Sequence, residues 1–176
     1  FEVRSGEQGQ AELEGLAVHC SGRAAAALGG EWRSVEAGAV QRRCATAADA
    51  GAFYSAFAAV GLEYGPAFRS VEAAWAGDGG GAARLRRRAA LQGTQVHPAD
   101  LDGALQLSTL LVRSNTGELR LPFMVGEAAL LAASGQMSAL VERQGSDKTN
   151  VALGSPLEPT SVALNGFETR ALKAMT

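Results

Sequence analysis

One stretch of eleven residues decides the fold of this chain: His97-Pro98-Ala99-Asp100-Leu101-Asp102-Gly103-Ala104-Leu105-Gln106-Leu107. A proline at its second position favours the first turn of a helix, because its missing N–H would have no partner there. Apolar and small side chains then recur at helical spacing and form one stripe, made of Leu101, Ala104, Leu105, Ser108, Leu111 and Val112. The stretch therefore predicts one long helix from Pro98 to about Val112.

Two polar residues of this helix, Asp102 and Gln106, are the candidates for chemistry. A carboxylate among leucines is costly to bury unless it is hydrogen-bonded or protonated. Gln106 follows four residues later, about 40° round the helix, and so shares the face of Asp102. A surface carboxylate and an exposed glutamine are the ordinary alternatives. We interpret the two as a pair, because Asp102 lies inside an otherwise apolar segment.

The neighbouring Asp100 and His97 are expected to have other roles. Asp100 falls in the first turn, off the apolar stripe, where the helix dipole favours a carboxylate. We therefore expect it at the surface and expect Asp100→Asn to be almost silent. His97 precedes Asp102 by five residues, which is about 140° round the helix. It is expected to begin the helix and to hydrogen-bond locally, not to act together with Asp102.

The rest of the chain predicts antiparallel strands around this helix. Strands are expected at 1–5 and 12–19, which would form a hairpin, and then at 70–76, 82–88, 125–132, 137–143, 149–153 and 160–170. Residues 24–46 are rich in Ala, Gly and Arg, without a clear period, and are interpreted as a linker. Asp49 is expected to cap a helix that ends near Val60. One long helix with several antiparallel strands is an α+β pattern.

Three motifs in this chain resemble the dehydratase domains of modular polyketide synthases and animal-type fatty acid synthases. The helix resembles their HPxxLDxxxQ signature, and the segment from Phe53-Tyr54 to Tyr64-Gly65-Pro66-Ala67-Phe68-Arg69 resembles FYxxxxxxGxxYGPxFR. Leu121-Pro122-Phe123 resembles the LPF segment of the family. The order of the three motifs agrees with the family, and the resemblance covers most of the chain.

This resemblance implies a hotdog fold, in which a curved antiparallel sheet wraps one long helix. It further implies the second half of a double hotdog. Residues 1–22 would be the closing hairpin of the first hotdog, 23–48 a linker, and 49–176 the C-terminal hotdog. The chain begins at Phe1 without an initiator Met, so we expect it to be part of a larger protein.

The resemblance also implies a reaction, the dehydration of a 3-hydroxyacyl thioester to the α,β-enoyl thioester. Asp102 would protonate the leaving hydroxyl, and Gln106 would hold its carboxyl. Seven motif residues would line or support the acyl and pantetheine tunnel, with turn formation and core packing as the alternative: Tyr64, Gly65, Pro66, Phe68, Leu121, Pro122 and Phe123. No metal or other bound cofactor is expected, since the substrate arrives on the phosphopantetheine of an acyl carrier protein. Other synthase domains, the N-terminal hotdog and a second copy of the chain would be further partners.

The chain departs from the family in one respect that matters for catalysis. The family's base is a histidine in an upstream HxxxGxxxxP motif, which is absent here; Arg23 stands where that motif would need glycine after His19. An acid and a base act as a unit, so losing either costs orders of magnitude in rate. We expect the chain alone to be inactive. A non-catalytic scaffold and an isomerase, cyclase or product-template activity remain alternatives, whereas the YGPxF motif disfavours a hotdog thioesterase.

Composition excludes several other classes of protein. The net charge of -2 over 176 residues gives no nucleic-acid footprint. Cys20 and Cys44 show no CxxC spacing, so neither a zinc site nor a disulfide framework is indicated. No apolar run of membrane-spanning length and no signal-peptide pattern occurs, which favours a cytoplasmic protein. One basic cluster is interpreted as the solvated face of a strand, or alternatively as a contact for an acidic carrier or phosphate-bearing arm: Arg84, Arg86, Arg87 and Arg88.

Overall fold

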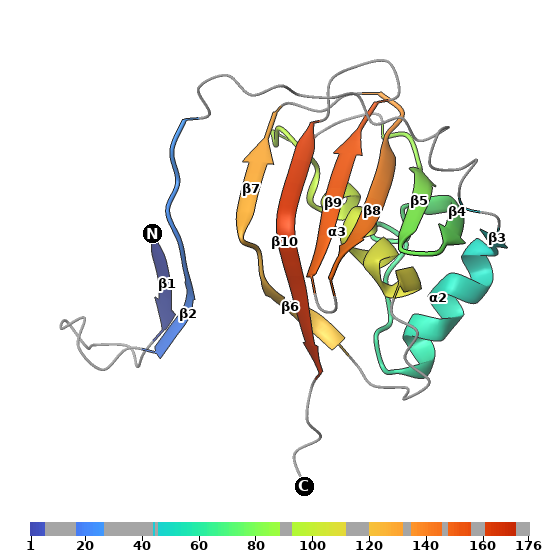
Figure 1. The fold of residues 1–176 in the computed structure, drawn as a ribbon, viewed down its shortest axis with the longest axis horizontal. Helices are drawn as coiled ribbons and strands as arrows, with labels where there is room; N and C mark the ends of the chain where they lie inside the picture. The colour runs from blue at the N-terminus through green and yellow to red at the C-terminus, as the bar shows by residue number, and fades with distance from the viewer. Residues whose placement is uncertain are drawn as a thin grey trace, which may run out of the picture. The chain divides into compact units, whose positions relative to one another are not determined.

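The computed structural model describes residues 1–5, 17–26, 44, 46–88, 93–111, 120–131, 135–145, 148–155 and 161–171. The chain divides into two compact units, Phe1–Glu31 and Trp32–Thr176. In the first unit, β1 (Glu2–Ser5) pairs antiparallel with β2 (Ala17–Ser21). This confirms the predicted hairpin; residues 12–16 of its predicted second strand lie outside the described part of the chain. Labels follow Figure 1.

The second unit is built on one antiparallel sheet (Figure 1). Its strands follow the order β3 (Thr46–Ala48), β4 (Val71–Gly77), β5 (Gly80–Leu85), β8 (Ser138–Gln144), β9 (Lys148–Gly154), β10 (Val162–Ala171) and β6 (Arg120–Met124). β10 also pairs with β7 (Glu127–Leu130) along its first half and with β6 along its second half. Between these halves its register with β9 shifts and Gly166 has φ 65, so β10 bends where the sheet changes direction.

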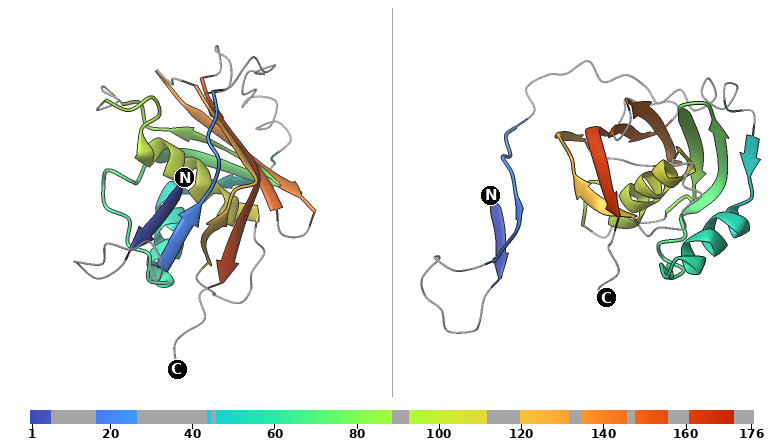
Figure 2. Two further views of the ribbon diagram at one scale, coloured as in Figure 1. Left: turned by 90° about the vertical axis from the view of Figure 1, so that its left-hand side faces the viewer. Right: turned by 60° about the horizontal axis from the view of Figure 1, so that its bottom comes forward.

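A single helical segment lies inside the curve of this sheet. It consists of α3 (Pro98–Gln106) followed by the 3₁₀ helix η1 (Leu107–Leu111). The right-hand view of Figure 2 shows the strands arranged in an arc around α3. The largest fully buried apolar side chains come from both the helix and the strands, namely Leu85, Leu107, Leu153, Val141, Val151 and Val162. An α+β unit with a sheet wrapped round one helix is therefore confirmed.

The central helix is shorter as an α-helix than the sequence predicted. The α-helical part ends at Gln106, and the last turn tightens to 3₁₀ geometry. Two hydroxyl groups explain the change, because each donates to the carbonyl three residues earlier: Ser108 Oγ to Leu105 O and Thr109 Oγ1 to Gln106 O, both at 2.7 Å. The predicted last residue, Val112, lies outside the described residues.

The helix α2 (Ala50–Ala59) agrees with its prediction. The carboxylate of Asp49 accepts a hydrogen bond from Ala52 N at 2.7 Å and so caps the first turn. Phe53 and Phe57 are buried from this helix, and their rings pack edge to face at 5.1 Å between centroids. The helix ends at Ala59 with Val60 as its C-cap, just before Gly61 with φ 87.

Four strand predictions need correction. β6 was not predicted as a strand, because Pro122 disfavours strand pairing; it is tolerated here since β6 lies at an edge of the sheet. β3 lies in the segment predicted as linker, yet it pairs with β4. β7 is shorter than the predicted 125–132. β5 ends at Leu85, so the last three arginines of the basic cluster lie beyond the strand.

Within the described residues, no helix is long and apolar enough to span a membrane.

Gly103 allows the central helix to approach β4 closely. The side chain of Ser70, just before β4, donates to Ala99 O of α3 at 3.0 Å. A Cβ added at Gly103 would overlap Ser70 Oγ and would meet the Leu85 side chain at 3.4 Å. A side chain at position 103 would therefore either displace the Ser70 hydroxyl from Ala99 O or push the helix away from the sheet.

Gly103→Ala is expected to lower the free energy of unfolding. Overpacking costs about 1–3 kcal/mol, which exceeds the roughly 1 kcal/mol that alanine gains over glycine in a helix. Adding Ser70→Ala should recover part of the loss, because it removes the overlapping hydroxyl. Gly65→Ala is the control for stability, since a Cβ there meets nothing within 4 Å. Denaturant melts check the series, and equal midpoints for Gly103→Ala and Gly65→Ala would contradict it.

Candidate active site

The helix α3 brings Asp102 and Gln106 into direct contact, as their spacing predicted. Gln106 Nε2 donates to Asp102 Oδ2 at 2.7 Å. Gln106 is only 3% exposed, so the alternative of an exposed glutamine is wrong. Asp102 is half-buried on the same helical face. The pair is therefore a partly desolvated carboxyl held by a buried amide.

Every polar atom of the Gln106 side chain has a partner. Its Nε2 also donates to Phe68 O at 3.2 Å, and its Oε1 accepts from the Tyr54 hydroxyl at 3.2 Å. The same hydroxyl accepts from Val71 N at 2.9 Å. Because a carbonyl can only accept, the NH₂ group of Gln106 must face Phe68 O and Asp102. Residues of α2, α3 and β4 and the Phe68 carbonyl thus fix the orientation of one amide.

The environment of Asp102 suits a proton donor. Burial raises the pKa of its carboxyl, while the hydrogen bond from Gln106 acts in the opposite direction and lowers that pKa; burial prevails. The carboxyl therefore keeps its proton to a higher pH than an exposed aspartate does. A general acid needs this property, because it must hold a proton near the working pH.

Tyr64 lies close enough to the pair for the charge of Asp102 and the Gln106 side chain to act on its hydroxyl. Its ring packs edge to face against Phe57 at 5.0 Å and against Tyr54 at 6.2 Å. Burial, followed by the charge of Asp102, raises the pKa of Tyr64 to about 12. Its hydroxyl therefore stays protonated and remains a hydrogen-bond donor at neutral pH.

Tyr54 belongs to the site although it was not among the predicted site residues. Its hydroxyl joins Gln106 Oε1 to the backbone of β4. Burial is the main cause that raises its pKa, so this hydroxyl also stays protonated. The signal was present in the sequence, since Tyr54 belongs to the FY pair that begins the second motif. Periodicity alone did not separate it from the apolar face of α2.

The YGPxF turn contributes main-chain atoms to the site. Phe68 N donates to Gly65 O at 3.0 Å, and Arg69 Nε donates to Tyr64 O at 2.8 Å. Gly65 and Pro66 are exposed, and Phe68 is 40% exposed. The Phe68 carbonyl, not its ring, is the group that reaches Gln106. The turn thus orients the amide that holds Asp102.

The LPF residues lie elsewhere on the sheet. Leu121, Pro122 and Phe123 belong to β6, in which Leu121 and Pro122 pair with β10 and Phe123 lies at the register shift. The Arg170 guanidinium carbon lies 3.3 Å from the centroid of the Phe123 ring. All three are exposed, and none of the contacts described for them is with Asp102. A role for these residues at the reacting atoms remains a prediction.

Asp100 is buried, and the prediction that it lies at the surface is wrong. It is 4% exposed, and its Oδ1 lies 2.7 Å from Arg88 Nε. The helical periodicity placed it off the apolar stripe, but the segment after β5 covers that side of the first turn. The solvated-face interpretation of the basic cluster fails for Arg88 for the same reason, although Arg84, Arg86 and Arg87 are exposed.

His97 caps the helix, as predicted. Its Nδ1 accepts from Ala99 N at 3.1 Å. His19 lies in β2 of the first unit. Among the described residues, no group of three or more His, Cys, Asp or Glu side chains could hold a metal ion.

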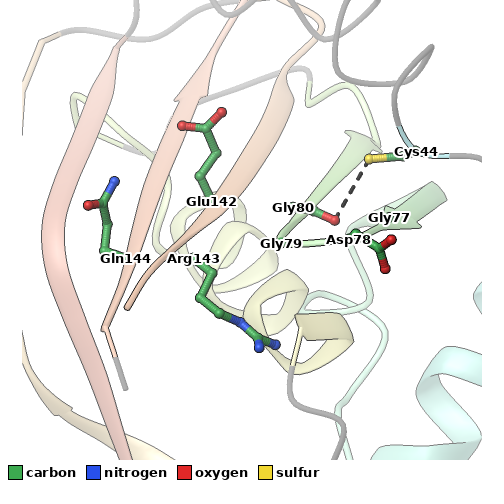
Figure 3. Close-up of a pocket in the computed structure, with 8 residues that line it drawn as sticks. All are labelled: Cys44, Gly77, Asp78, Gly79, Gly80, Glu142, Arg143 and Gln144. Carbon is green, nitrogen blue, oxygen red and sulfur yellow. Dashed lines mark hydrogen bonds between the residues drawn. The ribbon is translucent and has the colours of Figure 1, made fainter. Parts of the chain in front are cut away.

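Among the residues that the structure describes, two cavities lie near these elements, and neither of these two is lined by Asp102 or Gln106. One, of about 220 Å³, lies at the β4–β5 turn and the end of β8 (Figure 3). There the Cys44 thiol donates to Gly80 O at 3.7 Å, and the consecutive side chains of Glu142 and Arg143 point in opposite directions. The other cavity, of about 410 Å³, lies beside α2 and is lined by Tyr54, Arg69 and Arg86 among others. Only the second one borders the candidate site.

Comparison with known proteins decides the family. The family model described as "Polyketide synthase dehydratase N-terminal domain" matches residues 33–158, which is more than half of the chain. The chain belongs to the polyketide synthase dehydratase family. This agrees with the resemblance carried by the three sequence motifs. In this dehydratase chain, the half-buried carboxyl of Asp102 is therefore the group to explain.

Similar proteins support the same family and fold. The dehydratase chain is 36% identical over 160 residues to the polyketide synthase ThaG of Burkholderia thailandensis, covering 88% of this chain and 3% of that protein. It is 33% identical over 128 residues to the spectinabilin polyketide synthase system protein NorB of Streptomyces orinoci, covering 69% and 6%. A solved trans-AT polyketide synthase dehydratase domain from Brevibacillus brevis superposes with a TM-score of 0.81 at 26% identity, covering 98% of this chain and 64% of that domain. The hotdog fold is thereby confirmed.

Proposed function

We propose that this chain supplies the acid half of a dehydratase site that acts on 3-hydroxyacyl chains. The observation that carries the proposal is the desolvated Asp102 carboxyl, held by the fully bonded amide of Gln106. In the reaction, a base removes the α-proton and the C–O bond to the β-hydroxyl breaks. The leaving oxygen takes the proton of Asp102 and departs as water, so the α,β double bond forms. Tyr64, Gly65, Pro66 and Phe68 would bind the acyl and pantetheine portion beside it, with Leu121, Pro122 and Phe123 farther along the tunnel.

The substrate in this proposal is carried on the phosphopantetheine of an acyl carrier protein, and no metal or other bound cofactor takes part. The two similar polyketide synthases support a carrier-bound substrate. Both are far longer than this chain, which spans 3% and 6% of them, so each contains much more than this one domain. The acyl carrier protein and the other synthase domains would be partners, and a cytoplasmic location is part of the same proposal. Isomerase, cyclase and product-template activities use the same fold, so the product must be identified directly.

We also propose that residues 49–176 are the C-terminal hotdog, 23–48 a linker whose last three residues form β3 of the sheet, and 1–22 the closing hairpin of a first hotdog. The matching family model is described as the N-terminal domain, so this division rests on the three motifs. Exposed apolar side chains support the proposal that a partner surface covers them in the complete domain. In the second unit Phe123, Met124 and Leu130 are 51%, 41% and 47% exposed, and in the first unit Val3 and Val18 are exposed. Apolar surface of this kind marks an interaction site.

Gln106→Leu tests the proposed acid through its pH dependence. The hydrogen bond from Gln106 lowers the pKa of Asp102, so its loss should raise that pKa further. Since the acid must be protonated, the alkaline limit of activity should move to higher pH. At the optimum, kcat should fall about tenfold or more, because the carboxyl is no longer oriented. The complete domain is assayed for the enoyl thioester by mass spectrometry across a pH series.

The control for this variant is Gln144→Leu, which makes the same substitution at an exposed position at the end of β8. Its pH profile should match that of the parent. An alkaline limit that does not move in Gln106→Leu would mean that Asp102 is not the titrating acid.

A further inference from the structure

The partly buried ion pair of Arg88 and Asp100 connects two segments of the candidate site. Arg88 Nε donates to Asp100 Oδ1 at 2.7 Å, and Arg88 Nη2 donates to Ala67 O at 2.9 Å. The Asp100 side chain is 5% exposed and that of Arg88 is 21% exposed. One planar guanidinium therefore joins the first turn of α3 to the YGPxF turn. An arginine can do this because its donors form a rigid fork.

The peptide group between Ala67 and Phe68 is held at both of its polar atoms. Arg88 binds its carbonyl, and its N–H, which belongs to Phe68, donates to Gly65 O at 3.0 Å. Because a peptide group is planar, fixing both atoms fixes its plane. The next carbonyl along the chain is Phe68 O, which accepts from Gln106 Nε2. The orientation of this carbonyl therefore depends on where the Ala67–Phe68 peptide is held.

A chain of contacts thus runs from the ion pair to the acid. The guanidinium holds the Ala67–Phe68 peptide, the Phe68 carbonyl orients the amide of Gln106, and that amide holds the carboxyl of Asp102. The other end of the guanidinium is anchored on α3 itself, the helix that carries both Gln106 and Asp102. The pair therefore fixes the turn relative to the helix on which the acid lies.

We propose that Arg88 and Asp100 are positioning residues for the proton donor, acting through the YGPxF turn. Neither touches the reacting atoms. The inference rests on the proposed function, because it requires Asp102 to be the acid. Local patterns do not reveal this pair, since they predict an exposed, silent Asp100 and favour a solvated Arg88.

The test separates positioning from stability by removing the pair as a whole. Arg88→Met with Asp100→Leu leaves no unpaired buried charge, so its thermal midpoint should stay close to that of the parent. Its kcat should fall about tenfold or more with little change in KM, because the Ala67 carbonyl loses its anchor. The alkaline limit of activity should also move to higher pH, because a loosened Gln106 no longer favours the ionised form of Asp102. The titration of Tyr54 and Tyr64, which share this site, would not cause this move, because both stay protonated through their raised pKa values.

Two further variants keep the inference falsifiable if this double variant does not fold. Arg88→Lys keeps a positive charge opposite Asp100 but lacks the fork that reaches Ala67 O, so kcat should fall several-fold at a normal thermal midpoint. Asp100→Asn keeps an acceptor for Arg88 Nε and leaves the fork in place. It should therefore lower the thermal midpoint while kcat stays close to that of the parent. The matched control is Arg84→Met with Glu72→Leu, which removes an exposed pair 3.5 Å apart and should change neither value.

All variants are made in the complete dehydratase domain, with Asp102→Asn measured in parallel. The positioning role would be overturned if Arg88→Lys kept a normal kcat and an unmoved alkaline limit. The double variant Arg88→Met with Asp100→Leu would have to give the same result wherever it folds. A loss of activity that only follows unfolding would overturn it as well. If Asp102→Asn itself kept its activity, the proposed function would fail instead, so the two failures are distinguishable.

Discussion

Asp102→Asn in the complete dehydratase domain is expected to lower kcat by more than about a hundredfold while the fold stays intact. A positioned general acid contributes about a hundredfold to ten-thousandfold in rate, and an amide cannot replace the proton that Asp102 would deliver. The fold should survive because asparagine has nearly the same shape, and its carbonyl can accept the hydrogen bond from Gln106 that Asp102 Oδ2 accepts now at 2.7 Å.

The measurement is the rate of enoyl thioester formation from a 3-hydroxyacyl pantetheine thioester, together with a thermal melt. Glu63→Gln is the matched control, because it makes the same change from carboxylate to amide at an exposed position. Asp100→Asn, the control suggested by periodicity, is unsuitable because Asp100 is buried against Arg88. Turnover within a few-fold of the parent by a well-folded Asp102→Asn would remove Asp102 from the mechanism.

The 176-residue chain by itself is expected to form little or no enoyl product. The α-proton of a thioester needs a base, and an aspartic acid that is kept protonated as a donor cannot also remove a proton. His97 does not supply a base from α3, because it caps that helix through Nδ1. Acid and base act as a unit, so the missing base alone should cost orders of magnitude in rate.

The test is an assay of the purified chain with and without a separately made N-terminal hotdog that contains the HxxxGxxxxP histidine. Activity should depend on the added hotdog, and the two should associate through the exposed apolar side chains of β6 and β7. Robust product formation by the chain alone would contradict this expectation. Single substitutions His19→Ala and His97→Ala would then identify the base.

Local sequence patterns predicted much of the site because those signals act over short distances. Four-residue spacing places Asp102 and Gln106 on one face of any helix, and a proline after a capping side chain begins a helix at His97. In the same way, Asp49 caps α2, and the sharp turn at Gly79, with φ 79, joins β4 to β5. Such features depend on a few neighbouring residues, so one sequence is enough to predict them.

Predictions failed where the outcome depended on residues far apart in the chain. Asp100 has the local pattern of an exposed first-turn acid, but it pairs with a residue twelve positions earlier. Tyr54 has the local pattern of a core aromatic, yet its hydroxyl meets an amide fifty-two positions later. The β6 strand was missed because its ladder partner β10 lies some forty to fifty positions away, and Pro122 weakens the local strand signal.

The sequence by itself thus determined the family motifs, the central helix and the pairing of a carboxyl with an amide on that helix. Only the tertiary structure decided which polar groups are buried, because burial depends on what the other elements cover. It placed the Phe68 carbonyl and the Tyr54 hydroxyl on either side of Gln106, and it placed Arg88 against Asp100. The physical reason is that a carboxyl's pKa and a buried amide's orientation depend on neighbours that only folding brings together.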